Sequence, residues 1–199
     1  MASEPTAVLL NDRPYNGQQP AVLHHSNPML DQFNLANSQD VTIQGPSGST
    51  ATFFDNNSYQ TDENYLMIVK TTDADVRLNL ADDRGGQPPA QAGNGVYKGD
   101  AEGYTWILFK NVKGDFLQQA IGPFESWVAT IPVIGNDLEP VVKAIEALAR
   151  AVLRVDEVEW QQEPWGQFID LHDSMDGSAN YHVDNVSSIL FGVGETHAL

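Results

Sequence analysis

The sequence has no cysteine and few basic residues. Without cysteine it can form no disulfide, thiolate metal site or cysteine nucleophile. Cysteine usage therefore does not indicate whether the protein works in an oxidising or a reducing compartment. Lys and Arg total 10 against 27 Asp and Glu, which gives a formal net charge of −17. Such a surface repels nucleic acid and anionic membranes, so we expect neither as a partner. The acid excess indicates a soluble, self-repelling surface, with adaptation to high salt or cation binding as alternatives.

Long hydrophobic runs are also missing. The N-terminal segment lacks the basic region and the apolar stretch of a signal peptide. The longest candidate for a membrane segment, residues 127–135, is interrupted by Pro132 and falls well short of the ~20 apolar residues that a span needs. We therefore expect no transmembrane segment. Three locations stay open: cytoplasmic, exported without a cleaved signal, or secreted or particle-associated after a signal has been removed.

What the sequence does have is short apolar runs rich in β-branched and aromatic residues, separated by Asn, Asp, Gly, Pro and Ser. Short strands with turn signals between them predict a mainly β fold, an antiparallel sandwich or barrel. With 199 residues and 41% hydrophobic content, the chain can form one large domain or two small ones. The predicted strands are residues 7–10, 41–43, 51–54, 65–69, 76–80, 104–109, 128–133, 158–160, 168–171 and 186–191.

The middle of the chain differs in composition. Residues 81–103 contain six Gly and two Pro with almost no apolar content, which predicts a linker or a long surface loop. This segment divides the chain into residues 1–80 and 104–199. We expect each half to be an antiparallel, Greek-key-like sandwich.

One segment breaks the strand pattern and predicts an amphipathic helix over residues 138–154. Asn136 or Asp137 can cap its start, and Pro140 fits the first turn. The polar face mixes acidic and basic residues, so we expect the helix to cover the open side of a sheet; a membrane-active or partner-binding helix is the alternative. Its apolar positions follow helical spacing: Leu138, Val141, Val142, Ile145, Leu148, Ala149 and Val152.

Four segments share one pattern, in which an apolar strand is followed by an Asn, Asp or Gln corner, an aromatic or Gly pair, and a return strand. They are residues 8–18, 52–62, 107–116 and 158–168. Such repetition indicates duplicated supersecondary units. Corner glycines can take φ > 0 and let a hairpin fold over its own sheet, although ordinary hairpin turns explain each segment equally well when it is taken alone.

Three of these features carry a family resemblance. Tyr15-Asn16-Gly17 forms an aromatic-x-Gly corner, Trp165-Gly166 forms a looser one, and Asn185-Val186-Ser187-Ser188-Ile189 is a Ser-containing closing strand. In these features the chain resembles the βγ-crystallin family, over roughly residues 6–80 and 104–193. Tyr59-Gln60-Thr61 lacks the corner glycine, and a helix is inserted before the fourth segment, so another two-layer β fold stays open.

The resemblance implies calcium as the bound cation, held by oxygen ligands. Asp184 and Ser187 lie where the family's ligands would be, with Glu163 from a corner loop as a further ligand, although Val183 occupies the position of the first acidic residue. The alternative is that Ser187 and Ser188 only bond backbone groups in a turn.

Other residues indicate chemistry less specifically. Residues 170–185 bring two His and several carboxylates together, but their spacing fits no compact metal signature, and a polar hairpin explains them. Trp165 lies at a corner and is a candidate for stacking on a sugar, whereas Trp160 is expected to face the core. The sequence has no G-x-S-x-G, phosphate-binding Gly loop or H-E-x-x-H motif.

These observations favour a non-catalytic structural or binding protein, such as a component of a particle or filament, acting through a protein partner or self-assembly. A secreted or injected toxin-like protein with a membrane-active helix is the first alternative. A calcium-dependent module that binds carbohydrate or a surface is the second. We expect no cofactor other than this calcium.

Overall fold

A computed structural model of the protein describes residues 4–11, 21–30, 33–34, 40–60, 65–79, 95–99, 104–111, 131, 137–153, 155–163, 166–170 and 185–192. In chain order the elements of this part are β1 (Ala7–Asn11), β2 (Ala21–Leu23), β3 (Phe33–Asn34), β4 (Asp40–Gln44), β5 (Thr50–Phe54), the short turn η2 (Asn57–Tyr59), β6 (Tyr65–Lys70), β7 (Val76–Asn79), β8 (Gly95–Gly99), β9 (Trp106–Asn111), α3 (Glu139–Leu153), β10 (Gln161–Glu163), β11 (Gly166–Asp170), β12 (Asn185–Val186) and β13 (Ser188–Phe191).

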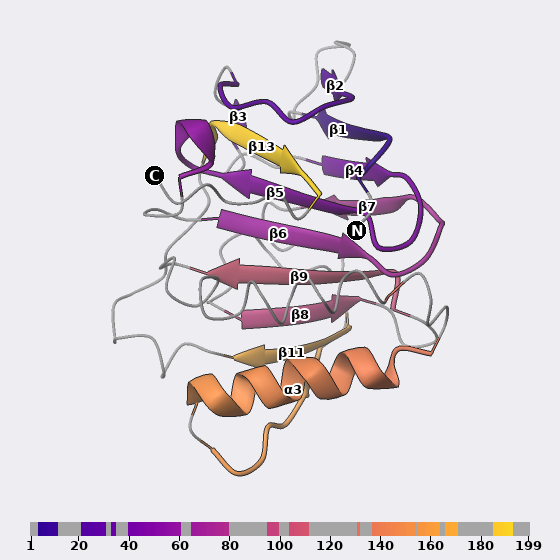
Figure 1. Cartoon of the computed structure of the whole chain (residues 1–199), viewed down its shortest axis with the longest axis vertical. Coiled ribbons are helices and arrows are strands. Elements are labelled where there is room, and N and C mark those ends of the chain that lie inside the picture. The colour runs from indigo at the N-terminus through magenta and orange to yellow at the C-terminus, as the bar shows by residue number, and fades with distance from the viewer. Residues whose placement is uncertain are drawn as a thin grey trace.

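These strands form two main sheets, and every pairing in them is antiparallel. Among the described residues, the four-stranded sheet has the order β2-β1-β4-β7, and the seven-stranded sheet has the order β10-β11-β8-β9-β6-β5-β13. β3 and β12 form a separate pair. Figure 1 views the seven-stranded sheet face-on, with β13 at the top and β11 near the bottom. The predicted mainly β fold with one amphipathic helix is confirmed, while the Greek-key connection remains a prediction.

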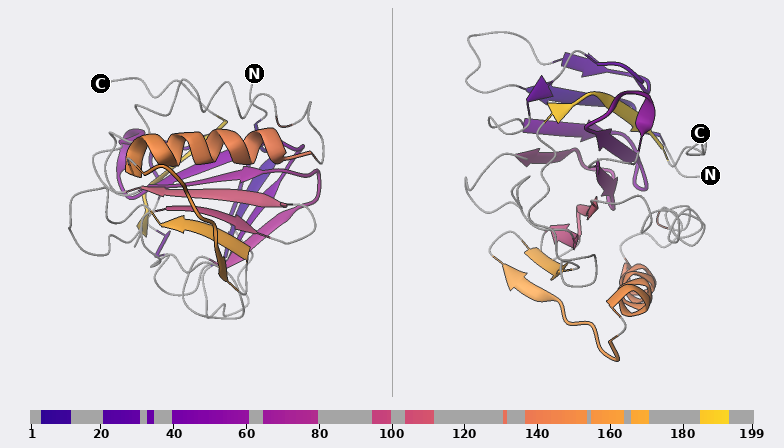
Figure 2. Two further views of the ribbon diagram at one scale, coloured as in Figure 1. Left: turned by 90° about the horizontal axis from the view of Figure 1, so that it is seen from below. Right: turned by 90° about the vertical axis from the view of Figure 1, so that its left-hand side faces the viewer.

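The central strands of the seven-stranded sheet are buried on both faces. One face packs against the four-stranded sheet and the other lies under α3, so the molecule has three layers (Figure 2). Every residue of β5, β6 and β8 is buried. Burial on both faces explains why a segment such as 65–69 is apolar throughout and does not alternate with polar residues. The four-stranded sheet does alternate, with Val8 and Leu10 buried and Leu9 between them partly exposed.

Two adjacent turns carry the chain between the sheets. Residues 45–49 connect β4 to β5, and residues 71–75 connect β6 to β7. Lys70 exchanges backbone hydrogen bonds with the first turn, and Ser47 N donates to Asp73 Oδ1 at 2.8 Å. These bonds satisfy backbone groups that would otherwise be unpaired, and they fix one sheet against the other.

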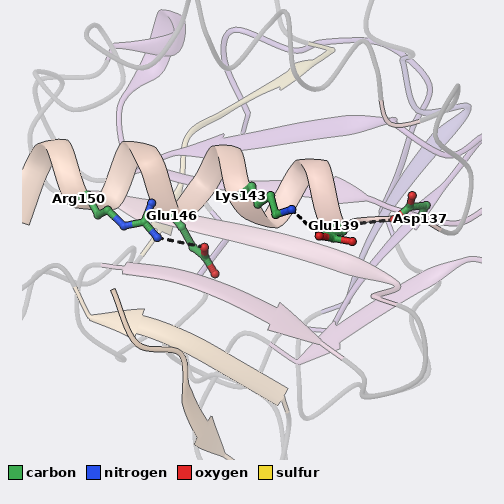
Figure 3. A network of polar contacts seen from close by, with 5 residues as sticks. All are labelled: Asp137, Glu139, Lys143, Glu146 and Arg150. Atoms are coloured by element: carbon green, nitrogen blue, oxygen red, sulfur yellow. Dashed lines mark hydrogen bonds and ion pairs between the residues drawn. The ribbon is translucent and has the colours of Figure 1, made fainter. Parts of the chain in front are cut away.

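Helix α3 confirms the predicted helix to within one residue at each end. Asp137 Oδ1 accepts a hydrogen bond from Glu139 N at 3.2 Å, so Asp137 serves as the predicted cap. Its polar face carries the pairs Glu139 with Lys143 and Glu146 with Arg150 (Figure 3). None of the helices in the described residues has the length and apolar character needed to cross a lipid bilayer. The side chains that α3 buries against the seven-stranded sheet are Val141, Ile145 and Ala149, with Leu138 just before the first turn.

The linker predicted over 81–103 is wrong at Gly95–Gly99, which forms β8. This strand lies inside the seven-stranded sheet, between β9 and β11. Its glycines allow close approach, because a Cβ on Gly99 would meet the Trp106 indole at 2.0 Å and one on Gly95 would meet the Ile169 carbonyl at 2.5 Å. The glycines that suggested a loop are therefore required by the packing of this strand.

The halves 1–80 and 104–199 meet within the seven-stranded sheet and do not fold as two separate sandwiches. β5 and β6 come from the first half, whereas β9, β10, β11 and β13 come from the second. The strand predicted at 158–160 is also wrong, since the chain there is irregular and β10 begins at Gln161. The strand predicted at 128–133 and the Tyr15-Asn16-Gly17 corner lie outside the described residues, apart from Ile131.

Candidate functional site

Strand β8 carries a buried lysine. Lys98 is 1% exposed. Because successive side chains of a strand point to opposite faces, Lys98 shares the α3 face with Val96, while Tyr97 faces the four-stranded sheet. A buried charge is costly unless other groups replace the water around it, so the neighbours of Lys98 define a candidate site.

Two aromatic side chains enclose the Lys98 ammonium group. Nζ donates a hydrogen bond to Tyr104 Oη at 3.0 Å and lies 4.3 Å from the centroid of that ring. It lies 3.4 Å from the centroid of the Trp160 ring. Tyr104 Oη donates in turn to Gln167 Oε1 at 3.5 Å, and Gln167 is directly opposite Lys98 in the β8–β11 register. Aromatic faces attract cations most strongly where water is excluded, so the rings stabilise the charged form.

Helix α3 adds a carboxylate to these groups. Glu146 Oε1 accepts a hydrogen bond from Trp160 Nε1 at 3.1 Å. Its Oε2 pairs with Arg150 Nη2 at 3.4 Å, as Figure 3 shows. The Glu146 side chain is 22% exposed and stands at the boundary between the interior and solvent. We refer to Lys98, Tyr104, Glu146, Trp160 and Gln167 as the lysine cage.

Burial dominates the electrostatics of the lysine cage. It lowers the pKa of Lys98 to about 8, although the carboxylate of Glu146 acts in the opposite direction. Burial raises the pKa of the Tyr104 hydroxyl, and Glu146 raises it further. At neutral pH Lys98 is therefore mostly protonated, and its charge depends on the cage for compensation.

The cage joins parts of the chain that are distant in sequence. Lys98 comes from β8, Gln167 from β11, Tyr104 from the residues before β9, Trp160 from the segment after α3, and Glu146 from α3 itself. The amine is fully occupied by these neighbours and almost inaccessible to solvent. The arrangement is suited to holding α3 and the β10–β11 hairpin on the sheet.

A second buried lysine lies at the turns between the sheets. Lys70 is fully buried, and Nζ donates to the carbonyl oxygens of Ile43 at 3.4 Å and Asp73 at 3.5 Å. Burial lowers the pKa of Lys70, while the charges of Asp75 and Asp73 raise it. Lys70 therefore stabilises the turns, and the lysine cage is the larger polar cluster.

The structure does not bring the predicted calcium ligands Glu163 and Ser187 together. Glu163 ends β10, at one edge of the seven-stranded sheet, and Ser187 precedes β13, at the opposite edge. Six strand spacings separate them, roughly 25–30 Å at about 4.8 Å each, which is too far for one cation. Asp184 and the predicted sugar-stacking residue Trp165 lie outside the described residues.

The closing serines bond backbone groups. Ser187 is 5% exposed, its N–H donates to Phe54 O at 2.8 Å, and its carbonyl accepts from Leu30 N at 2.7 Å. Ser188 Oγ donates to Asn56 O at 2.6 Å and accepts from Tyr59 N at 3.1 Å. Ser188, a residue of strand β13, therefore uses its hydroxyl to bond backbone groups of the distant segment 56–59.

Sequence reasoning found part of the lysine cage. The prediction that Trp160 faces inward agrees with its partly buried ring over Lys98. Glu146 was assigned to the polar face of the helix, and Lys98 to the linker. The available signal was a lone lysine between Tyr97 and Gly99, in a chain with few basic residues.

The sequence contains two further groups of histidines, in residues 170–185 and at His24-His25. The His and carboxylate cluster at 170–185 lies almost wholly outside the described residues. Within the part of the chain that the structure describes, no group of three or more His, Asp or Glu side chains could hold a metal ion. His24 and His25 are exposed, and His24 Nδ1 lies 3.1 Å from Thr6 O.

Comparison with known proteins gives no relative. The chain matches no family model, no curated protein and no solved structure. The βγ-crystallin resemblance therefore stays a prediction, and the function has to be inferred from the geometry of this chain.

Proposed function

We propose that this protein is a non-catalytic structural or binding protein that self-assembles through one edge of its four-stranded sheet. The observation that carries this proposal is an uncharged, exposed edge in a molecule of high negative charge. The burial of Lys98 also supports a non-catalytic role, because its amine is used for internal contacts.

The edge begins at β2, which together with β7 is an outer strand of the four-stranded sheet as the described residues form it. Residues 21–30 contain no Asp, Glu, Lys or Arg, whereas the whole chain has a net charge of −17. Val22 is 47% exposed and Met29 is 69% exposed. We call residues 21–30 the uncharged edge.

The uncharged edge continues from one sheet to the other. Asn27 N donates to Ile189 O at 2.8 Å, and Ile189 N donates to Asn27 O at 2.9 Å, so the segment also lies along β13. Figure 1 shows β2 and β13 at the same end of the molecule. An outer strand presents backbone groups to which another strand can pair.

Charge decides where two copies can meet. Two molecules with this net charge repel one another over most of their surfaces, and the repulsion is smallest where both lack charged side chains. Pairing of β2 with β2 of a second copy would bring together two uncharged strands and their exposed valines. Self-association through this edge therefore avoids repulsion between like charges. It also gives the outward-facing backbone groups of β2 hydrogen-bond partners.

Sedimentation velocity in plain buffer tests the proposal on a matched pair of variants. Val22→Lys places a charge in the middle of β2 and is expected to convert the oligomer to monomer. Val155→Lys makes the same change in charge at another exposed valine, 44% exposed and after α3, and is expected to sediment like the parent protein. A monomeric parent, or equal effects of the two substitutions, would overturn the proposal.

A further inference from the structure

The contact between α3 and the seven-stranded sheet is not purely apolar. Val141, Ile145 and Ala149 bury the apolar face of the helix. Beside them, Glu146 is connected to Lys98 through the Trp160 indole, which donates to the carboxylate with its N–H and covers the ammonium with its ring. A polar chain therefore joins the helix to the sheet within an otherwise hydrophobic interface.

The charges around Lys98 are unevenly distributed among the elements that pack on it. Strand β11 contributes the uncharged Gln167, the segment after α3 contributes the Trp160 ring, and the residues before β9 contribute the Tyr104 hydroxyl. From α3 the group that acts on Lys98 is Glu146, which is itself paired with Arg150 and also interacts with the charge of Lys143. Among these described groups, Glu146 supplies the negative charge that compensates the buried ammonium.

We propose that Lys98, Trp160 and Glu146 form a latch that opens in acid and releases α3 from the seven-stranded sheet. Loss of the negative charge of Glu146 leaves the positive charge of Lys98 without its compensating partner. A buried charge that loses its compensating partner is strongly destabilising. Movement of α3 and of the Trp160 segment away from β8 lets water reach Nζ and relieves that cost. The strand pairing within the two sheets does not depend on the latch, so both sheets stay folded.

Hydrogen exchange of the full chain, measured by mass spectrometry as the pH is lowered and corrected for the intrinsic pH dependence of exchange, tests this latch. The residues of α3 are expected to lose protection at a higher pH than β4 and β7 of the four-stranded sheet. Loss of protection in α3 and in β4 and β7 at the same pH would mean global unfolding and would overturn the proposal.

Two pairs of variants separate the latch from general acid effects. Glu146→Gln is expected to lower the hydrogen-exchange protection of α3 already at neutral pH. Glu139→Gln, on the exposed face of the same helix, is expected to leave this protection as it is in the parent protein. Lys98→Met is expected to keep α3 protected down to the pH at which β4 and β7 open. Lys98→Gln replaces it if the methionine variant does not fold, as judged by protection of β4 and β7 at neutral pH.

Arg150→Met completes the design, because it removes the partner of Glu146 at the surface and leaves Lys98 in place. In Arg150→Met, α3 is still expected to lose hydrogen-exchange protection at a higher pH than β4 and β7 do. An unchanged transition in both Lys98 variants, or α3 protection in Glu146→Gln equal to that of the parent at every pH, would overturn the latch. Because oligomerisation is not part of this readout, failure here leaves the proposed self-assembly standing.

Discussion

At the scale of single residues, the burial of Lys98 couples folding stability to pH. Its pKa is lowered from the ordinary 10.5 to about 8 in the folded protein. Below pH 8 the group is protonated in both states, and the cost of burying the charge is fully present. Between about 8 and 10.5 the unfolded chain binds more protons than the folded one, so the free energy of unfolding rises with pH.

The first prediction is tested by measuring the free energy of unfolding in urea at several pH values. The lowered pKa of Lys98 implies that the free energy of unfolding rises by about 3 kcal/mol at most over this pH range. This value is an upper bound, because residual screening by solvent reduces the effect. Lys98→Met is expected to lack this rise, while Lys143→Met, at an exposed lysine on α3, is expected to retain it. Comparison with the parent removes the contributions of Lys70 and the tyrosines. Equal pH profiles of Lys98→Met and the parent protein would contradict the prediction.

Gly166 gives the second prediction at this scale. It begins β11 with φ +144, a positive value that glycine adopts more readily than other residues. A Cβ there would lie 1.9 Å from the Lys98 carbonyl oxygen. Gly166→Ala is therefore expected to cost at least about 1–3 kcal/mol of stability, from backbone conformation alone. In urea denaturation Gln161→Ala, exposed on the same hairpin, should change stability much less; similar midpoints for the two variants would count against this account.

At the scale of elements, the packing of α3 on the sheet buries apolar side chains and so stabilises the fold. Ile145 is 3% exposed in the cluster between the helix and the sheet. Ile145→Ala is expected to cost about 2–5 kcal/mol, because it removes buried methyl groups and leaves a cavity. Thermal or urea denaturation checks this third prediction. Ala144→Ser, on the exposed side of the same turn, is expected to cost less than about 0.7 kcal/mol.

The elements that could be predicted from sequence are those with a strong local pattern. The helix had an apolar stripe and a cap, and β5 and β6 were continuous apolar runs bounded by turn residues. β8 was missed because Gly95, Lys98 and Gly99 are atypical of a central strand. Gly99 is explained by the packing of Trp106, Gly95 by the close approach of the Ile169 carbonyl, and Lys98 by its cage. All of these are tertiary contacts.

The candidate site was only partly predictable for the same reason. Trp160 could be expected to face inward from its neighbours in sequence, but its partners are Lys98 and Glu146, which come from different elements. Glu163 and Ser187 were grouped on the basis of a family resemblance, and strand order places them at opposite edges of the sheet. Residue type indicates what a side chain can bind, whereas strand order decides what it can reach.

At the scale of the whole molecule, net charge governs association. If the uncharged edge mediates self-assembly, the remaining surfaces of the two copies still repel one another, with −17 on each chain. Salt screens this repulsion over about 10 Å at 0.1 M ionic strength. The fourth prediction is that the association constant from sedimentation equilibrium increases with sodium chloride. An association constant that falls with added salt would instead indicate attraction between opposite charges at the interface.

The division of the chain into two halves could not have been tested without strand order. The Gly- and Pro-rich composition of 81–103 suggested a boundary, but β8 from this segment pairs with β9 and β11 of the second half. β6 of the first half also pairs with β9. Composition reports local preference, and these pairings depend on residues far apart along the chain.

The position of β13 has a consequence for synthesis on the ribosome. Ser188–Phe191 pairs with Thr50–Phe54, so β5 has β6 on one side and waits for the last strand on the other. A nascent chain that has made everything through α3 therefore still exposes one side of β5. This side is covered only after Ser188–Phe191 has left the exit tunnel, and until then it offers a pairing site to neighbouring chains. Completion of this sheet therefore depends on a segment that is synthesised long after the strand with which it pairs.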